Sequence, residues 1–296
     1  MPSPWPGTDP AAKAPAAGLY VVATPIGNLE DITLRALRTL SGVALIAAED
    51  TRHTSRLLSH FGIRTPLISC HEHNERQRTT ELIGKIRDGA AVALVSDAGT
   101  PSVSDPGYRL VSAALEAHID VIPIPGVSAA ITALSASGLA TDSFVFAGFA
   151  PKGSGRRKTL LQSLADEPRT LLFYESPHRI LAFLDDLQHV LGDRPAVLAR
   201  ELTKVHEEFI RGPLSHIRSV LAARATVKGE CTLLVGGKSV TDDPAPTGLD
   251  AALREALAEP GARLSAVVRQ VAARLGLPRK QVYAAALALQ GRPDDA

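Results

Sequence analysis

Residues 91–107 read Ala-Val-Ala-Leu-Val-Ser-Asp-Ala-Gly-Thr-Pro-Ser-Val-Ser-Asp-Pro-Gly, an apolar run of strand length followed by a loop of small residues. The pattern predicts a strand over 91–96 and a helix that begins at Pro106, with Asp105 as its N-cap. Open α/β sheets bind ligands in loops of this kind, at the carboxyl ends of parallel strands. The same residues would also serve as a plain connection between a strand and a helix.

Similar strand and helix units surround this stretch. Short apolar runs at 19–23, 43–47, 67–70 and 121–124 alternate with segments whose Leu and Ile residues recur at helical spacing. This alternation predicts a parallel sheet with helices on both faces. The loops that follow 19–23 and 121–124 would join the 97–107 loop at one sheet edge and form a crevice. None of these loops carries a dinucleotide fingerprint or a P-loop.

A second set of strands follows at 144–149, 170–175, 196–201, 207–211 and 231–235. Some of these runs follow one another without a full helix between them, which favours a mixed sheet. The fold class is therefore α/β, with two α/β domains. We place the first domain at residues 18–130 and the second at 131–238.

The composition changes after the second domain. Residues 239–248 are rich in Pro and Asp and predict a linker to a helical module over 249–296. Two apolar helical stripes flank Gly276-Leu-Pro278, a pattern typical of a helix-turn-helix. Residues 261–292 hold six Lys or Arg and no Asp or Glu. This module is either a solvated helical hairpin or a surface that contacts nucleic acid.

The overall composition excludes several classes of protein. The chain has 296 residues, a formal net charge of +1 and 45% apolar residues, so it is neither wholly disordered nor a mass-action binder of nucleic acid. Two cysteines cannot build a disulfide framework and indicate a cytoplasmic protein. No run is long enough to cross a bilayer, and residues 1–17 are predicted to be a flexible tail without a signal sequence. His71 and His73 have no third ligand in view, so we expect no metal site.

Six segments taken together resemble the small-subunit rRNA methyltransferase I family, within the tetrapyrrole methylase superfamily. They are Val-Ala-Thr-Pro-Ile-Gly-Asn-Leu-Glu-Asp-Ile-Thr at 22–33, Ala-Glu-Asp-Thr-Arg at 48–52, residues 96–107, Phe-Ala-Gly-Phe-Ala-Pro at 146–151, Phe-Tyr-Glu-Ser-Pro-His-Arg at 173–179 and Ala-Arg-Glu-Leu-Thr-Lys at 199–204. The resemblance covers about residues 18–237, and the C-terminal helices are also similar to that family's. It implies 2′-O-methylation of a cytidine ribose in the decoding region of 16S rRNA by a homodimer.

The resemblance also implies that S-adenosylmethionine lies in a cleft between the two α/β domains. The residues that it assigns to cofactor contacts are mostly small, so backbone groups are expected to dominate. These residues are Asp97, Ala98, Gly99, Thr100, Ser128, Ala129, Tyr174, Leu202 and Thr203.

The chemistry of methyl transfer to a ribose sets further requirements. The sulfonium already activates the methyl group, so the enzyme chiefly aligns the attack, and a base that favours deprotonation of the hydroxyl would help. Acidic residues near the ends of predicted strands are the candidate bases: Glu49, Asp50, Glu175 and Glu201. Basic residues of the same segments could hold flanking phosphates: Arg52, Arg179, Arg200 and Lys204. Each of these residues could instead form an ion pair at a sheet end.

Two other functions remain open at this point. One is methylation of a tetrapyrrole or another small substrate on the same fold, and the other is non-catalytic binding of nucleic acid. The basic C-terminal helices and the four basic residues of 152–158 favour RNA, although 152–158 could be a solvated loop. The crevice formed by three loops argues against a non-catalytic binder.

Overall fold

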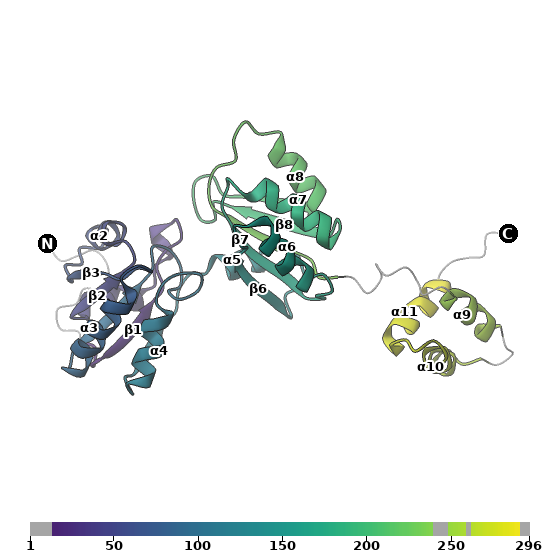
Figure 1. Cartoon of the computed structure of the whole chain (residues 1–296), viewed down its shortest axis with the longest axis horizontal. Coiled ribbons are helices and arrows are strands. Elements are labelled where there is room, and N and C mark those ends of the chain that lie inside the picture. Colours follow the sequence, from purple (N-terminus) through teal and green to yellow (C-terminus); the bar gives the residue numbers. More distant parts are fainter. Residues whose placement is uncertain (1–13, 239–247, 259–261, 291–296) are drawn as a thin grey trace. The chain divides into compact units, whose positions relative to one another are not determined.

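The computed structural model describes residues 14–238, 248–258 and 262–290 (Figure 1). Two compact units are present: an α/β unit that runs to Gly236 without Ala165–Pro168, and a second unit that contains the C-terminal helices. Most of the expected tail and linker, and Arg292, lie outside the described residues. In the described part of the chain, no helix has both the length and the apolar character needed to cross a membrane.

The first sheet of the α/β unit is entirely parallel. Its order is β3-β2-β4-β1-β5. The strands are β1 (Gly18–Val22), β2 (Leu45–Ala48), β3 (Leu67–Ser69), β4 (Ala91–Val95) and β5 (Val121–Ile124). The predicted parallel sheet is confirmed, with strand ends that differ by one or two residues from the sequence prediction.

Helices cover both faces of this sheet because successive strand residues point to opposite sides. On one face, Ala93 and Val95 of β4 pack with α1 (Leu34–Gly42) and α2 (Thr51–His60). On the other face, Val92 and Leu94 pack with α3 (Glu75–Arg87) and α4 (Tyr108–Glu116). A short 3-10 helix, η1 (Leu29–Asp31), precedes α1.

The second sheet is mixed, as predicted. Its order is β6-β7-β10-β8-β9, in which only the β6–β7 pair is parallel. The strands are β6 (Phe144–Phe149), β7 (Thr170–Glu175), β8 (Pro195–Arg200), β9 (Glu208–Pro213) and β10 (Cys231–Val235). The helices that accompany them are α5 (Ala129–Ser135), α6 (Ser154–Ser163), α7 (Ile180–Leu191) and α8 (Leu214–Ala222). Ala130 and Leu134 of α5 pack on Leu172 and Leu234 of this sheet.

The predicted start of α4 is wrong. The helix begins at Tyr108, and Gly107 is its N-cap with a φ of 128°. The buried Glu75 side chain accepts hydrogen bonds from the backbone N–H groups of Gly107 (3.0 Å) and Arg109 (3.2 Å). Because an acid from α3 satisfies these amides, Asp105 is not needed as a cap and lies in the loop before the helix.

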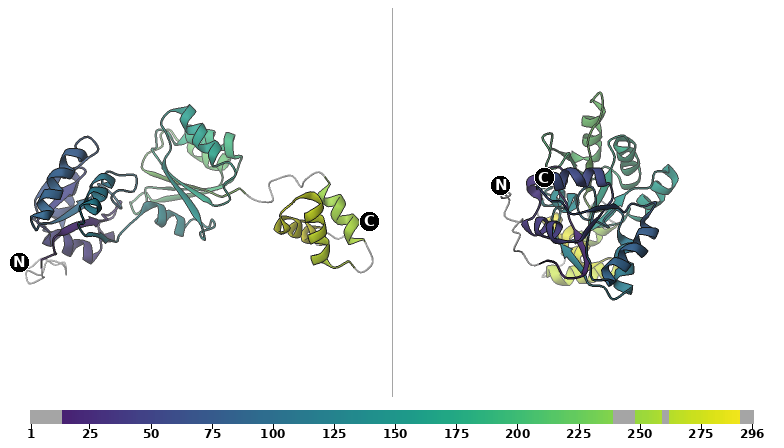
Figure 2. Two further views of the ribbon diagram at one scale, coloured as in Figure 1. Left: turned by 60° about the horizontal axis from the view of Figure 1, so that its bottom comes forward. Right: turned by 90° about the vertical axis from the view of Figure 1, so that its left-hand side faces the viewer.

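The described residues of the C-terminal unit form three helices, drawn in green to yellow in Figure 2: α9 (Leu249–Leu257), α10 (Leu264–Leu275) and α11 (Arg279–Gln290). Val267, Val271 and Val282 belong to their common core. The turn between α10 and α11 contains Gly276 in a left-handed conformation, so the expected helix-turn-helix is accompanied by one further helix.

Candidate active site

A cavity of about 390 Å³ lies at the carboxyl ends of the parallel strands, between loops of the two sheets of the α/β unit. A cavity of this volume suits a small organic ligand. The first sheet and α5 contribute one part of the lining: Ile26, Glu49, Asp97–Thr100, Val103–Asp105, Ser128 and Ala129. The second sheet contributes the rest: Phe149, Tyr174–Pro177 and Glu230–Thr232.

The loop after β4 is held in place by the loop after β1. Thr24 and Gly99 exchange two backbone hydrogen bonds of 2.9 and 3.0 Å, and the Thr24 hydroxyl donates to the Ser96 carbonyl. Gly99 has a φ of 81°, which favours glycine. Ser102 and Ser104 also have positive φ, at 69° and 64°. This strained loop therefore presents its backbone in a fixed conformation to the cavity.

Five acidic residues line the cavity, with no Lys, Arg or His among its described lining residues. Glu175 and Glu230 are paired with Arg179 and Lys204, which lie outside the lining. The other three have no ion pair within the described part of the chain and lie on the side of the first sheet: Glu49, Asp97 and Asp105. Burial, and then repulsion from Glu49, raises the pKa of Asp105 to about 6. Burial, followed by repulsion from Asp97, also raises the pKa of Glu49. Such a cluster favours a proton or a bound cation, and it includes acids whose pKa is closer to neutrality than usual.

The opposite wall of the cavity is built around Tyr174. Its ring packs against Phe146 and Phe149, with ring centroids 5.0 and 5.6 Å away. The Tyr174 hydroxyl accepts a hydrogen bond of 3.1 Å from the backbone N–H of Ala130, which connects β7 to the first turn of α5. Burial raises the pKa of the nearby Cys231 thiol to about 12, which keeps that thiol protonated and unreactive.

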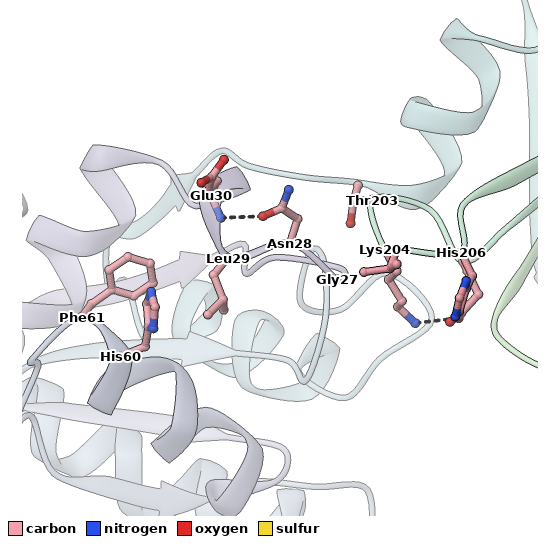
Figure 3. A pocket seen from close by; sticks show the side chains of 11 residues that line it. Gly27, Asn28, Leu29, Glu30, His60, Phe61, Thr203, Lys204 and His206 are labelled. Carbon is pink, nitrogen blue, oxygen red and sulfur yellow. Dashed lines mark hydrogen bonds and ion pairs between the residues drawn. The ribbon is translucent and has the colours of Figure 1, made fainter.

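Seven of the nine residues expected to contact the cofactor line this cavity: Asp97, Ala98, Gly99, Thr100, Ser128, Ala129 and Tyr174. The other two lie elsewhere. Leu202 is buried among apolar residues of the second sheet and α5. Thr203 lines a separate, wider hollow of about 810 Å³ together with Gly27, Leu29 and Lys204 (Figure 3).

Of the four candidate bases, Glu49 and Glu175 line the cavity. Glu175 is already engaged, since its carboxylate accepts from the Ser176 N–H and pairs with Arg179 at 2.9 Å. Asp50 is the N-cap of α2 and accepts from the Arg52 N–H. Glu201 pairs with Lys204 at 2.8 Å, and this hydrogen bond is the main reason that its pKa is lowered.

The four candidate phosphate ligands also differ in their surroundings. Arg179 donates to the Ala150 carbonyl and pairs with Glu175, and Arg200 pairs with Glu208 at 3.0 Å. Lys204 lines the wider hollow but is shared between Glu201 and Glu230. Arg52 is exposed at the start of α2. The geometry therefore leaves Arg52 as the candidate most available to a phosphate.

Sequence reasoning missed several residues of the cavity. Asp105 was assigned to the helix cap, and Ser104, Phe149, Cys231 and Thr232 were not considered as cavity residues. Phe149 lies within the motif at 146–151, and Ser104 and Asp105 lie within the loop at 97–107. Their positions in these segments could therefore have predicted that they line the cavity. Cys231 and Thr232 begin an ordinary apolar strand, so their positions carry no such indication.

The basic segment at 152–158 is divided: Lys152 and Arg156 are exposed, whereas Arg157 and Lys158 lie next to an acid of α7. Arg157 is buried and donates to Asp186 of α7 at 2.7 Å, and Lys158 lies 3.8 Å from the same carboxylate. From Ser154 onward the segment is the first turn of α6. In the described ranges, no group of three or more His, Cys, Asp or Glu could hold a metal ion.

Comparison with known proteins defines the class. Residues 18–218 match the model of the family described as Tetrapyrrole (Corrin/Porphyrin) Methylases. The chain therefore belongs to the tetrapyrrole methylase family and is a methyltransferase that uses S-adenosylmethionine. A crystal structure of uroporphyrin-III C-methyltransferase from Thermus thermophilus, complexed with S-adenosylhomocysteine, shares the fold with a TM-score of 0.55. It is 21% identical, over 74% of this chain and 97% of that chain.

Curated relatives narrow the comparison to one kind of methylase. A Synechocystis protein named ribosomal RNA small subunit methyltransferase I is 53% identical over 92% of this chain and 98% of its own length. A Pseudomonas aeruginosa protein of the same name is 47% identical over 94% of this chain and 99% of its own length.

Proposed function

We propose that this methyltransferase transfers a methyl group from S-adenosylmethionine to the 2′-oxygen of a cytidine ribose in the decoding region of 16S rRNA. The observation that carries the proposal is the acidic cavity beside Gly99, in a chain that is 53% identical to a relative named as an rRNA methyltransferase. The enzyme would act as a homodimer in the cytoplasm, where its substrate is assembled.

The cavity suits this cofactor in volume and charge. Bound S-adenosylmethionine supplies a methyl group that its sulfonium charge already activates. The sulfonium and the ammonium of its methionine part are cations, which fit a cavity with Glu49, Asp97 and Asp105 in its lining. The backbone of residues 97–100, held by the Thr24–Gly99 bridge, would position the nucleoside part.

Within this arrangement, Asp105 is our candidate for the general base, with Glu49 beside it. Its pKa of about 6 leaves it unprotonated near neutral pH and more basic than an ordinary aspartate. Asp105 would accept the proton of the ribose 2′-hydroxyl while the 2′-oxygen attacks the methyl carbon. Glu175 and Glu201 are less suitable because each is paired with a cation, and Asp50 is less suitable because it caps α2.

The C-terminal unit would add affinity for RNA. Arg263, Arg269, Arg279 and Lys280 are exposed on α10 and α11 or next to them, whereas Arg274 is neutralised by Glu255 at 3.1 Å. Deletion of residues 239–296 should weaken RNA binding and flatten its salt dependence while cofactor binding survives. An unchanged salt slope in a folded truncated protein, checked by sedimentation, would refute this role. The same sedimentation runs report whether the full chain is a dimer.

The decisive experiment compares substrates in parallel. Methyl transfer from labelled cofactor is measured with 30S subunits, naked 16S rRNA and a precorrin. A 2′-O-methyl group blocks alkaline cleavage of the adjacent phosphodiester bond, so a gap in the hydrolysis ladder locates the modified ribose. Transfer only to the precorrin would support methylation of a small substrate instead, and labelled RNA without a gap would place the methyl group on a base.

A further inference from the structure

The outward face of α2 carries a row of basic side chains. Arg52, His53, Arg56 and His60 are all exposed, and their spacing of three and four residues places them on one side of the helix. The helix contains no Asp or Glu between Thr51 and His60. The row begins beside the cavity, because Glu49 lies just before α2 and the Asp50 N–H donates to Asp97.

This arrangement is unfavourable for the helix itself. Like charges four residues apart, such as Arg52 and Arg56, repel each other. Arg52 also lies in the first turn, where the helix dipole disfavours a cation; this turn contains no acid, and the N-cap Asp50 precedes it. Within residues 14–238, 248–258 and 262–290, Arg52, His53 and Arg56 have no ion pair. Two arginines of one helix face, Arg52 and Arg56, therefore have no ion pair among the described residues, which favours an anionic ligand.

The row lies beside hollows that share lining residues. His53 and Arg56 line a small hollow of about 170 Å³ together with Leu29 and Asp97. Asp97 also lines the cavity, and Leu29 also lines the wider hollow. Figure 3 shows His60 at one end of that wider hollow and Lys204 and His206 at the other. The three spaces therefore follow one another from the N-terminus of α2 to its C-terminus.

We propose that these hollows hold the RNA strand next to the nucleotide that is methylated. The inference rests on the proposed function: the cavity takes the target ribose, and Arg52 and Arg56 bind the phosphates that follow it. The helix is about 15 Å long, which is enough for a short run of nucleotides. The wider hollow, with exposed Leu29 and Val205 as apolar surface, receives a neighbouring base or sugar. Arginine suits this role because its guanidinium binds phosphate oxygens in pairs.

The test is the double variant Arg52→Gln/Arg56→Gln. Affinity for a 16S rRNA fragment is measured across a range of salt concentrations. Each lost phosphate contact should weaken binding up to about fivefold and reduce the salt slope by about 0.7, as expected for single strands. The loss should appear in KM for RNA rather than in kcat, and calorimetric affinity for S-adenosylmethionine should not change. Arg56→Gln alone should give half of the slope change.

Arg87→Gln is the matched control. Arg87 is an exposed arginine of α3, a helix that packs on the opposite face of the first sheet. It should bind RNA as the wild type does. A double variant with wild-type affinity and slope would overturn the inference while leaving the proposed function intact, since the wild type would still methylate RNA. A wild-type protein that neither binds nor methylates RNA would overturn both.

Discussion

Two groups of acids in the α/β unit have opposite electrostatic surroundings. In the cavity, Glu49 and Asp105 face another carboxylate, and their pKa values are raised, to about 6 for Asp105. At the second sheet, Glu201 is paired with Lys204, and Glu208 is held between Arg200 and Arg224. Hydrogen bonds from Arg224, and then from Arg200, lower the pKa of Glu208 to about 2.

This difference indicates which acids are available to accept a proton from a substrate. A carboxylate that is held by arginine or lysine is a weak base and stabilises the fold, whereas unpaired carboxylates gain from binding a proton or a cation. Residue type and position do not separate the two groups, because each contains a Glu that directly follows a strand, Glu49 after β2 and Glu201 after β8. What separates the two groups is whether each carboxylate is paired with an arginine or lysine. The following predictions test that distinction.

The largest effect is expected from Gly99→Val in the cavity loop. A branched side chain at a φ of 81° distorts the loop, so binding of S-adenosylmethionine should be lost in calorimetric titration. Gly89→Val is the matched control, because Gly89 has a φ of 96° with open space around it and lies away from the cavity. Unchanged cofactor affinity in Gly99→Val would show that the site is elsewhere.

Asp105→Asn should lower kcat for methyl transfer by about 100-fold, the contribution typical of a general base. Cofactor affinity should fall less, because Glu49 and Asp97 remain. Glu201→Gln is the contrasting variant, since it removes a carboxylate that is already paired with Lys204. If Glu201→Gln loses as much turnover as Asp105→Asn, the division into free and paired acids is wrong.

Arg179→Met should destabilise the protein by about 2 kcal/mol in chemical denaturation, because it leaves the buried Glu175 carboxylate without its partner. The double variant Arg179→Met/Glu175→Gln should recover part of that loss. RNA affinity should change little in either variant. A specific loss of RNA affinity in a fully stable Arg179→Met protein would instead make this arginine a substrate ligand.

The pH dependence of kcat/KM should show a smaller effect than these substitutions. The folded pKa of Asp105 is raised, so kcat/KM should rise up to a pH of about 6 and then level off, with a roughly tenfold loss one unit lower. The inflection should disappear in Asp105→Asn. A profile without an inflection near 6 in the wild type would exclude Asp105 as the base.

The smallest effect is expected from Glu208→Gln, about 1 kcal/mol of stability, because the paired side chains remain partly exposed to solvent. The folded pKa of Glu208 is depressed, so its contribution is present above its usual pKa and is lost as the pH falls from about 5 towards 2. Denaturation curves of variant and wild type should therefore converge at low pH. A difference in stability between the variant and the wild type that persists at pH 2 would show that Glu208 contributes through packing rather than through its charge.

The sequence was sufficient for the architecture because buried strands and helical stripes are local patterns. It was not sufficient for the start of α4, since the cap comes from Glu75, 32 residues before Gly107. The same holds for the acids. One of the two partners of Glu208 is Arg224, which follows α8 in the chain, and no spacing rule connects these two residues. Similarly, Leu202 and Thr203 are neighbours in the sequence, but one is buried in the core and the other lines the wider hollow.

The backbone bridge between Thr24 and Gly99 also has a thermodynamic consequence. It ties the loop that lines the cofactor cavity to the loop that carries Thr24 and Pro25 into the small hollow beside α2. Because the two loops are joined, a ligand that shifts one loop also shifts the other, so we expect the affinities for the two substrates to be coupled. That coupling is reciprocal: the factor by which the cofactor changes the affinity for RNA equals the factor by which RNA changes the affinity for the cofactor.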